Sequence, residues 1–128
     1  MTEHVCDLIS KSCKPCEGGT SPLDDEHVRR YLDDLSGWVV DENSIFKKFE
    51  FKNYYQTISF VNAVAWIAHK ENHHPDMEVS YRACNIRYST HAINALSEND
   101  FICAAKVEAL ISGTNLSGCN SPKLASMN

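Results

Sequence analysis

Apolar residues recur at helical spacing in three stretches of the chain, and each stretch carries start or stop signals for a helix. The first follows Ser21-Pro22, where a capping serine precedes a proline at the first helical position. The second and longest spans residues 53–72, and Pro75 disfavours helical geometry beyond it. The third begins at the capping pattern Ser97-Glu98-Asn99-Asp100. The pattern therefore predicts three helices.

Four shorter stretches alternate between apolar and polar residues, which is the period of a strand with one wet face. Residues 38–40 and 45–51 flank a polar turn, and residues 77–81 and 84–88 repeat the arrangement after the long helix. The lysines and phenylalanines of residues 47–52 are explained as the wet and buried faces of one strand, rather than as a basic aromatic patch. The element order α-β-β-α-β-β-α predicts an α+β fold, a four-stranded antiparallel sheet with the helices packed on one face.

Both ends of the chain lack this periodicity and are rich in polar residues. We expect residues 1–20 to be a polar N-terminal tail and residues 113–128 a C-terminal tail. The folded domain is expected at residues 21–112, and the chain of 128 residues is long enough for one such domain.

The composition narrows the class of protein. The chain is 43% hydrophobic and 23% charged and has a formal net charge of -5, which argues against direct nucleic-acid binding. The sequence contains no run of about eighteen apolar residues, which a membrane-spanning helix would need. Its first residues lack the pattern of a secretory signal. A cytoplasmic protein with mostly reduced cysteines is therefore expected.

One cysteine motif leaves three alternatives open. Cys13-Lys14-Pro15-Cys16 has C-x-x-C spacing, which suits half a zinc site, a redox pair or a reduced tail without metal. Cys6 and His4 would complete a four-ligand set in the first case. We favour the reduced tail, because the sequence has no second C-x-x-C and no predicted strand precedes the motif.

Three histidines carry the candidate chemistry. His73 and His74 lie at the exit of the long helix in Glu71-Asn72-His73-His74-Pro75, and His91 ends the second hairpin in Ser89-Thr90-His91. Antiparallel pairing of that hairpin brings the two segments close together. Such a cluster suits general acid and base catalysis, with Asp100, Glu71 or Asp76 orienting the imidazoles.

A metal site is the alternative for the same region. His69 and His73 lie four residues apart on a predicted helix, and His91 would be a third ligand. The familiar H-E-x-x-H pattern is not met, because Glu71 is displaced by one position. We therefore expect no metal.

Four aromatic residues are candidates for stacking on a flat heterocycle, Trp38, Trp66, Tyr54 and Tyr55, although aromatic residues at helix and strand positions more often belong to the core. Trp38 lies at a helix-to-strand junction, where it is a candidate for a pocket wall. Trp66 lies within the long helix, and we assign it to the core.

These motifs together resemble the pterin-4a-carbinolamine dehydratase family, also called 4a-hydroxytetrahydrobiopterin dehydratases. The similarity runs from about Leu23 to Ile111, and the family's fold is the α-β-β-α-β-β-α arrangement predicted above. The segments that carry the resemblance are Gly37-Trp38, residues 45–51, Asn72-His73-His74-Pro75, Ser89-Thr90-His91 and Leu96-Ser97-x-x-Asp100.

The resemblance implies a hydro-lyase that acts without a metal or organic cofactor. Its substrate would be 4a-hydroxytetrahydropterin, the 4a-carbinolamine left by aromatic amino-acid hydroxylases, and its product quinonoid dihydropterin. This activity belongs to tetrahydrobiopterin biosynthesis and recycling and to phenylalanine catabolism. The resemblance also implies a homodimer or homotetramer with a functional link to phenylalanine hydroxylase.

The resemblance further implies a set of site residues. His73, His74 and His91 would carry catalysis, with His73 and His91 as the principal acid/base groups and His74 positioning the pterin. The implied substrate-binding residues are Trp38, Glu71, Asn72, Ser89, Thr90 and Asp100.

A non-catalytic role is the main rival. Animal relatives also act as a dimerisation cofactor for a homeodomain transcription factor, which keeps open a pterin-binding or protein-dimerisation module of the coactivator type. A molybdopterin-related or other pterin-binding role is a further alternative. The presence of all three histidines favours the enzyme, since a scaffold has no need of them.

Overall fold

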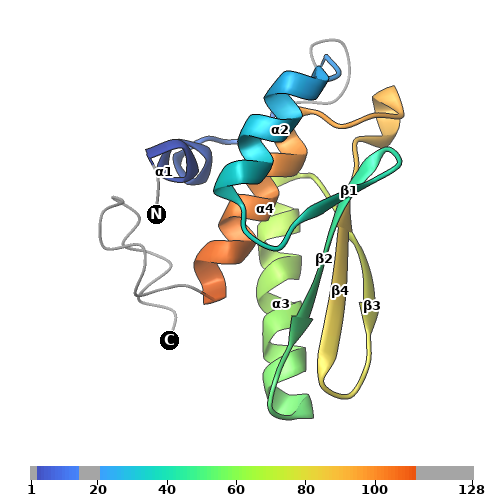
Figure 1. Cartoon of the computed structure of the whole chain (residues 1–128). Helices are drawn as coiled ribbons and strands as arrows, with labels where there is room; N and C mark the ends of the chain where they lie inside the picture. The colour runs from blue at the N-terminus through green and yellow to red at the C-terminus, as the bar shows by residue number, and fades with distance from the viewer. Residues whose placement is uncertain (1–2, 15–20, 112–128) are drawn as a thin grey trace.

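The expected α+β fold is confirmed by a computed structural model, which describes residues 3–14 and 21–111. Four antiparallel strands form one sheet in the order β1-β2-β4-β3, and the helices pack on one face of it (Figure 1). The strands are β1 (Val39–Asp41), β2 (Ser44–Glu50), β3 (Asp76–Val79) and β4 (Ala83–Tyr88). The helices are α1 (Glu3–Ser10), α2 (Asp25–Asp34), α3 (Tyr54–Glu71) and α4 (Glu98–Ile111), with a short 3-10 turn, η1 (His91–Ile93).

The inner face of the sheet is built from alternate residues of the two central strands. Ile45 pairs with Tyr88 and Phe49 pairs with Cys84, and all four side chains are buried. Because side chains alternate between the faces of a strand, the residues between them point away from the helices. The predicted strand alternation therefore describes the sheet well.

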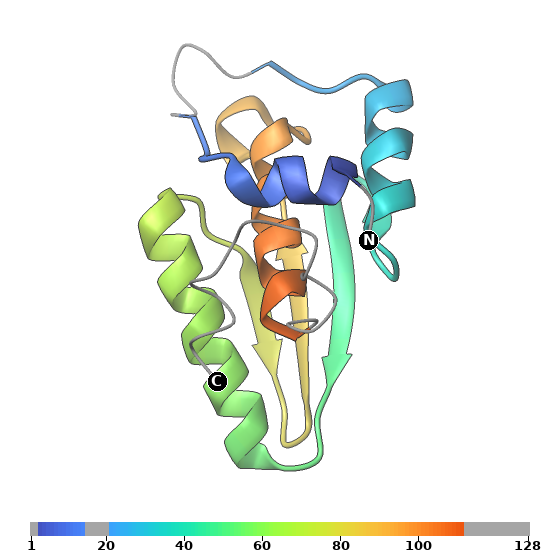
Figure 2. The same ribbon diagram turned by 90° about the vertical axis from the view of Figure 1, so that its left-hand side faces the viewer.

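Helix α4 occupies the centre of the helical layer. Figure 2 shows it in front of the sheet, beside α3 and crossed by α1. Phe101, Ile102 and Val107 are all buried, although they do not share one helical face. A helix that is buried around most of its circumference has neighbours on several sides, which explains its apolar sequence.

Helix α3 is bounded by two asparagines. The side chain of Asn53 accepts a hydrogen bond from the backbone N–H of Gln56 at 2.8 Å, which caps the first turn. At the other end Asn72 adopts a left-handed conformation (φ 52°, ψ 41°), and its N–H bonds to carbonyls of the last turn. The helix therefore stops at Asn72, before Pro75 can act on it.

Three local expectations were wrong. Helix α2 begins at Asp25 with Asp24 as its cap, because the Asp24 side chain accepts from the N–H of His27. Trp66 is not in the core: it is 55% exposed, on the solvent side of α3. Lys47 does not lie on the wet face, because it aligns with Ile86 on the inner face and forms an ion pair with Glu108.

Part of the expected N-terminal tail is structured. Helix α1 packs against α4 (Figure 2), and its Leu8 and Ile9 are buried. Lys106 of α4 donates a hydrogen bond to the carbonyl of Ile9 at 2.7 Å, and Lys11 lies 3.0 Å from the Glu98 carboxylate. The segment thus closes the outer side of α4. The expected C-terminal tail, residues 113–128, lies outside the described residues.

Replacing Leu8 with alanine tests this packing. We expect Leu8→Ala to lower the free energy of unfolding by about 2–4 kcal/mol, because it empties a fully buried site. Urea denaturation measures the change, and Ser12→Ala, at an exposed position, should stay within about 0.5 kcal/mol of wild type. Equal stability of Leu8→Ala and Ser12→Ala would contradict the packing.

The acid stability of the protein depends in part on Glu98. Its carboxylate accepts from Lys11 and from the hydroxyl of Tyr31 at 2.8 Å. Burial raises the pKa of Glu98, but the hydrogen bonds from Lys11 and Tyr31 outweigh it, so the pKa lies below its ordinary value. A lowered carboxyl pKa contributes stability above the unfolded pKa, and this contribution is lost as pH falls through the folded pKa.

We therefore expect Glu98→Gln to lower the Tm at neutral pH and to lose less Tm than wild type as the pH falls below 4.5. Thermal unfolding followed by circular dichroism between neutral pH and about pH 3 measures this. Glu26→Gln, at an exposed position of α2, should follow the wild-type curve. Parallel curves for wild type and Glu98→Gln would contradict the assignment.

Candidate active site

The centre of the candidate site is a buried pair between His73 and Asp100. The Nε2 atom of His73 lies 2.6 Å from Oδ1 of Asp100. Only 5% of His73 is exposed and Asp100 is fully buried. Removing a carboxylate from water is costly unless it is paired and hydrogen-bonded, so this contact constrains both groups strongly.

The second oxygen of the Asp100 carboxylate has two further partners. Its Oδ2 accepts from the Thr90 hydroxyl and from the backbone N–H of Ser97, both at 2.9 Å. The Thr90 and Ser97 hydroxyls also lie 2.7 Å apart, and Ser97 Oγ accepts from the N–H of Asn99. This is the capping box predicted at the start of α4. It fixes the direction of the carboxylate toward His73.

Local backbone geometry brings His73 to this position. After the left-handed turn at Asn72, the N–H of His73 bonds to the carbonyl of Ala68 at 3.2 Å. The ladder between β3 and β4 ends at Asp76 opposite Arg87. The same register continued along both chains places His73 opposite Thr90, which agrees with their shared bond to Asp100.

The other two histidines are the next residues in the sequence after His73 and Thr90, which Asp100 holds in place. His74 succeeds the buried His73 and is exposed, and His91 succeeds the buried Thr90 and is exposed. Thr90 is held by paired backbone bonds with Ala95, which also set the start of η1. The structure therefore brings both histidine segments to the same end of the sheet, as the hairpin predicted.

Tyr88 is a part of the site that the sequence did not single out. Its ring lies parallel to the His73 imidazole, with centroids 5.9 Å apart and an interplanar angle of 7°. Burial raises the pKa of Tyr88 well above its ordinary value, and the hydroxyl has no hydrogen-bond partner among the described residues. The sequence could have indicated this role, because Tyr88 shares the inward-facing period of β4 with Cys84 and Ile86. The stacked ring supports His73 from the core side.

Trp38 lies on the core side of the sheet. It is 4% exposed, packs against Phe49 and Tyr88, and donates from Nε1 to the Glu108 carboxylate at 2.9 Å. The Tyr88 ring contacts both Trp38 and His73, and so connects the two. Its role in pterin binding stays a prediction.

The remaining predicted binding residues occupy different environments. The Glu71 carboxylate accepts from the backbone N–H of Cys13 at 2.8 Å and lies 3.7 Å from Lys106. Asn72 provides the helix cap with an exposed side chain, and Ser89 is half-buried beside Thr90. Ser97, which is not among the predicted binding residues, contacts both Thr90 and Asp100.

Two other kinds of feature are absent from the described part of the chain. Within residues 3–14 and 21–111, no three His, Cys, Asp or Glu side chains gather as a metal site would require, and no helix is long and apolar enough to cross a membrane.

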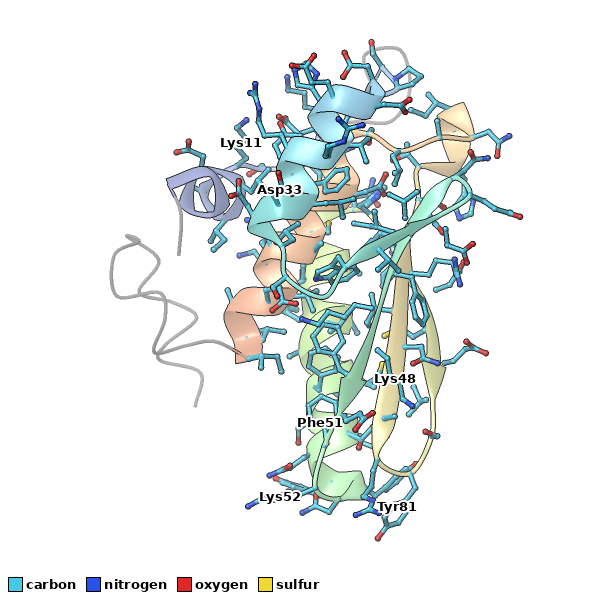
Figure 3. All side chains as sticks on the ribbon, in the orientation of Figure 1. Lys11, Asp33, Lys48, Phe51, Lys52 and Tyr81 are labelled. Atoms are coloured by element: carbon cyan, nitrogen blue, oxygen red, sulfur yellow. The ribbon has the colours of Figure 1, made fainter. Side chains whose placement is uncertain are left out.

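A surface hollow of about 660 Å³ lies at the far end of the sheet, away from the histidines. Lys48, Phe51 and Tyr81 line it (Figure 3), and no histidine does.

Comparison with known proteins identifies the family. The family model for pterin 4 alpha carbinolamine dehydratase matches residues 21–110. The chain belongs to the pterin carbinolamine dehydratase family. A relative from Nitrosomonas eutropha is 57% identical over 109 residues, which cover 84% of this chain and 96% of that protein. One from Dechloromonas aromatica is 50% identical over 106 residues, covering 83% and 95%. Both carry a provisional name as pterin-4-alpha-carbinolamine dehydratases.

Solved structures of pterin dehydratase-like proteins share the fold. A transcriptional coactivator/pterin dehydratase from Brucella melitensis superposes with a TM-score of 0.66 at 28% identity, covering 70% of this chain and 97% of that one. A pterin dehydratase-like RuBisCO assembly factor of the alpha-carboxysome gives a TM-score of 0.51 at 28% identity, covering 59% and 87%. Proteins that share this fold are therefore described in roles other than catalysis.

Changing Asp100 to asparagine tests the buried pair in this pterin carbinolamine dehydratase family member. The amide oxygen can still accept from Thr90 and Ser97, but the amide nitrogen then faces Nε2 of His73. We expect Asp100→Asn to lower the free energy of unfolding by about 2–4 kcal/mol and to change the protonated nitrogen of His73.

Urea denaturation and nitrogen NMR of the histidine rings measure the two effects. Asp76→Asn removes the same charge at an exposed position near the histidines and should change neither measurement appreciably. An Asp100→Asn protein with wild-type stability and an unchanged His73 spectrum would show that the buried pair is not significant.

Proposed function

We propose that the protein dehydrates 4a-hydroxytetrahydropterin to quinonoid dihydropterin. Its membership of the pterin carbinolamine dehydratase family supports this reaction class. The observation that carries the proposal is the buried His73–Asp100 pair, with the exposed His74 and His91 directly after the two residues that Asp100 anchors. This arrangement presents several imidazoles at one end of the sheet.

The reaction requires two proton transfers. The bond between C4a and the hydroxyl oxygen breaks, and the hydroxyl takes a proton and leaves as water. A pterin nitrogen loses a proton, and its electron pair forms the new double bond to C4a. An imidazole that delivers a proton and one that accepts a proton are therefore needed together.

We assign these two transfers to His73 and His91. The Asp100 carboxylate accepts from Nε2 of His73 and orients the ring, as a buried carboxylate does for a catalytic histidine. His91 is exposed and can reach the substrate from the end of β4. His74 positions the pterin, and Asp100 acts through His73.

Alanine substitutions test these roles in a coupled hydroxylase assay that follows tetrahydropterin turnover. We expect His73→Ala and His91→Ala each to lower the dehydration rate at least about 100-fold, the usual contribution of one general acid or base. His74→Ala should raise KM more than it lowers kcat, because it loses a binding contact.

The control is His27→Ala, which removes an exposed histidine on α2 and should keep the wild-type rate. Circular dichroism and the Tm of each variant separate loss of chemistry from loss of fold. Wild-type rates for both His73→Ala and His91→Ala would contradict the assignment.

A protein-binding module is the second candidate function. Three aromatic residues of α3 are exposed, Tyr54 at 52%, Tyr55 at 81% and Trp66 at 55%, and such residues are enriched in protein interfaces. The two similar solved proteins are described as a transcriptional coactivator/pterin dehydratase and a RuBisCO assembly factor. A chain that binds a tetrahydropterin analogue without accelerating dehydration would favour this candidate over the enzyme.

Three finer expectations belong to the enzyme proposal. They are a homodimer or homotetramer, a cytoplasmic location, and a functional link to phenylalanine hydroxylase in tetrahydrobiopterin recycling. The exposed aromatic residues of α3 support self-association. The absence of a required metal or organic cofactor is likewise part of the proposal.

A further inference from the structure

Two thiols from distant parts of the chain face each other behind the candidate active site. The Sγ atoms of Cys13 and Cys103 lie 3.5 Å apart, although the two residues are ninety positions apart in the sequence. Cys103 is fully buried in α4, whereas Cys13 is half-buried. A disulfide needs a separation of about 2.05 Å, so closure requires a movement of only about 1.5 Å.

The backbone around Cys13 is already held against the helices. The N–H of Cys13 donates to the Glu71 carboxylate at 2.8 Å. The N–H of Lys14 donates to the Asn99 side chain at 3.0 Å, and the carbonyl of Lys14 accepts from the same side chain at 2.8 Å. These bonds fix the segment at two points, so little conformational freedom remains to be lost when the sulfurs join.

The two thiols differ in their hydrogen-bond partners and in their exposure. The Cys13 Sγ lies 3.7 Å from the carbonyl oxygen of Asn99, to which its S–H can donate. The contact between the two sulfurs at 3.5 Å suits a hydrogen bond in which either thiol can be the donor. The hydrogen bond to Cys13 and burial both raise the pKa of Cys103, so Cys13, which is also the more accessible of the two, is the thiol that an oxidant meets first.

We propose that Cys13 and Cys103 form a reversible disulfide that fastens the N-terminal segment to α4. The bond joins a segment that contacts the end of α3 to the first turns of α4. These are the two elements that supply His73 and Asp100. The proposal rests on the contacts of the two thiols and is independent of the proposed function.

The chemistry balances with a hydroperoxide as the oxidant. The half-buried Cys13 sulfur attacks one peroxide oxygen, the O–O bond breaks, and a sulfenic acid and water form. The Cys103 sulfur then attacks the Cys13 sulfur, the S–O bond breaks, and the Cys103 proton leaves with the hydroxyl as water. Two thiols lose two electrons and two protons, and hydrogen peroxide is reduced to two waters.

The full-length reduced chain treated with one equivalent of hydrogen peroxide tests the proposal. After free thiols are alkylated, digestion without reductant and mass spectrometry should recover a linked peptide pair containing Cys13 and Cys103. Because the bond closes a loop of about ninety residues, the Tm of the oxidised chain should exceed that of the reduced chain by about 10 °C. Dithiothreitol should reverse both changes.

Matched cysteine variants identify the bond responsible. Cys13→Ser changes a half-buried residue, so it should fold, lose the linked peptide and show no rise of Tm on oxidation. Cys119→Ser should keep both effects. Cys16 lies outside the described residues, and a disulfide between Cys13 and Cys16 in place of the Cys103 bond would overturn the proposal. A rise of Tm that persists in Cys13→Ser would also overturn it.

Discussion

The carboxylate of Asp100 is the constraint on which the rest of the site depends. A charge that is fully buried must find its hydrogen bonds inside the protein, and this one finds them in three different segments. His73 comes from the end of α3, Thr90 from the end of β4 and Ser97 from the start of α4. The carboxylate is satisfied only when all three meet, which makes the corner of the fold and the site one structure.

The same corner is supported on its outer side by the N-terminal segment. Glu71 and Asn99 each lie close in sequence to a member of the buried pair, and both bind the backbone of residues 13–14. Helix α1 and Lys11 extend this contact along α4. The ends of α3 and α4 are therefore held together from within by Asp100 and from outside by a segment that lies before the matched family region.

Local signals predicted elements well wherever the stabilising partner is close in sequence. The capping box at Ser97 and the strand alternation both act within a few residues. The errors arose where the partner is distant. The alternation of β2 places Lys47 on the inner face, whereas its charge favours the solvent-exposed face. The ion pair with Glu108, on another element, makes the inner position possible. The prediction places Trp66 in the core because it is a large aromatic residue in a helix, but another face of α3 packs against the rest of the protein.

The sequence alone determined the α+β element order, the family and the proximity of His73 to His91, because periodicity, short motifs and hairpin register are local properties. Only the tertiary structure decided which histidine is buried, where Asp100 directs its oxygens, and that residues 3–14 pack on α4. Burial and hydrogen-bond partners depend on residues far apart in the chain. Cys13 and Cys103 illustrate the difference, because they are ninety positions apart and no local pattern predicts that their sulfurs meet.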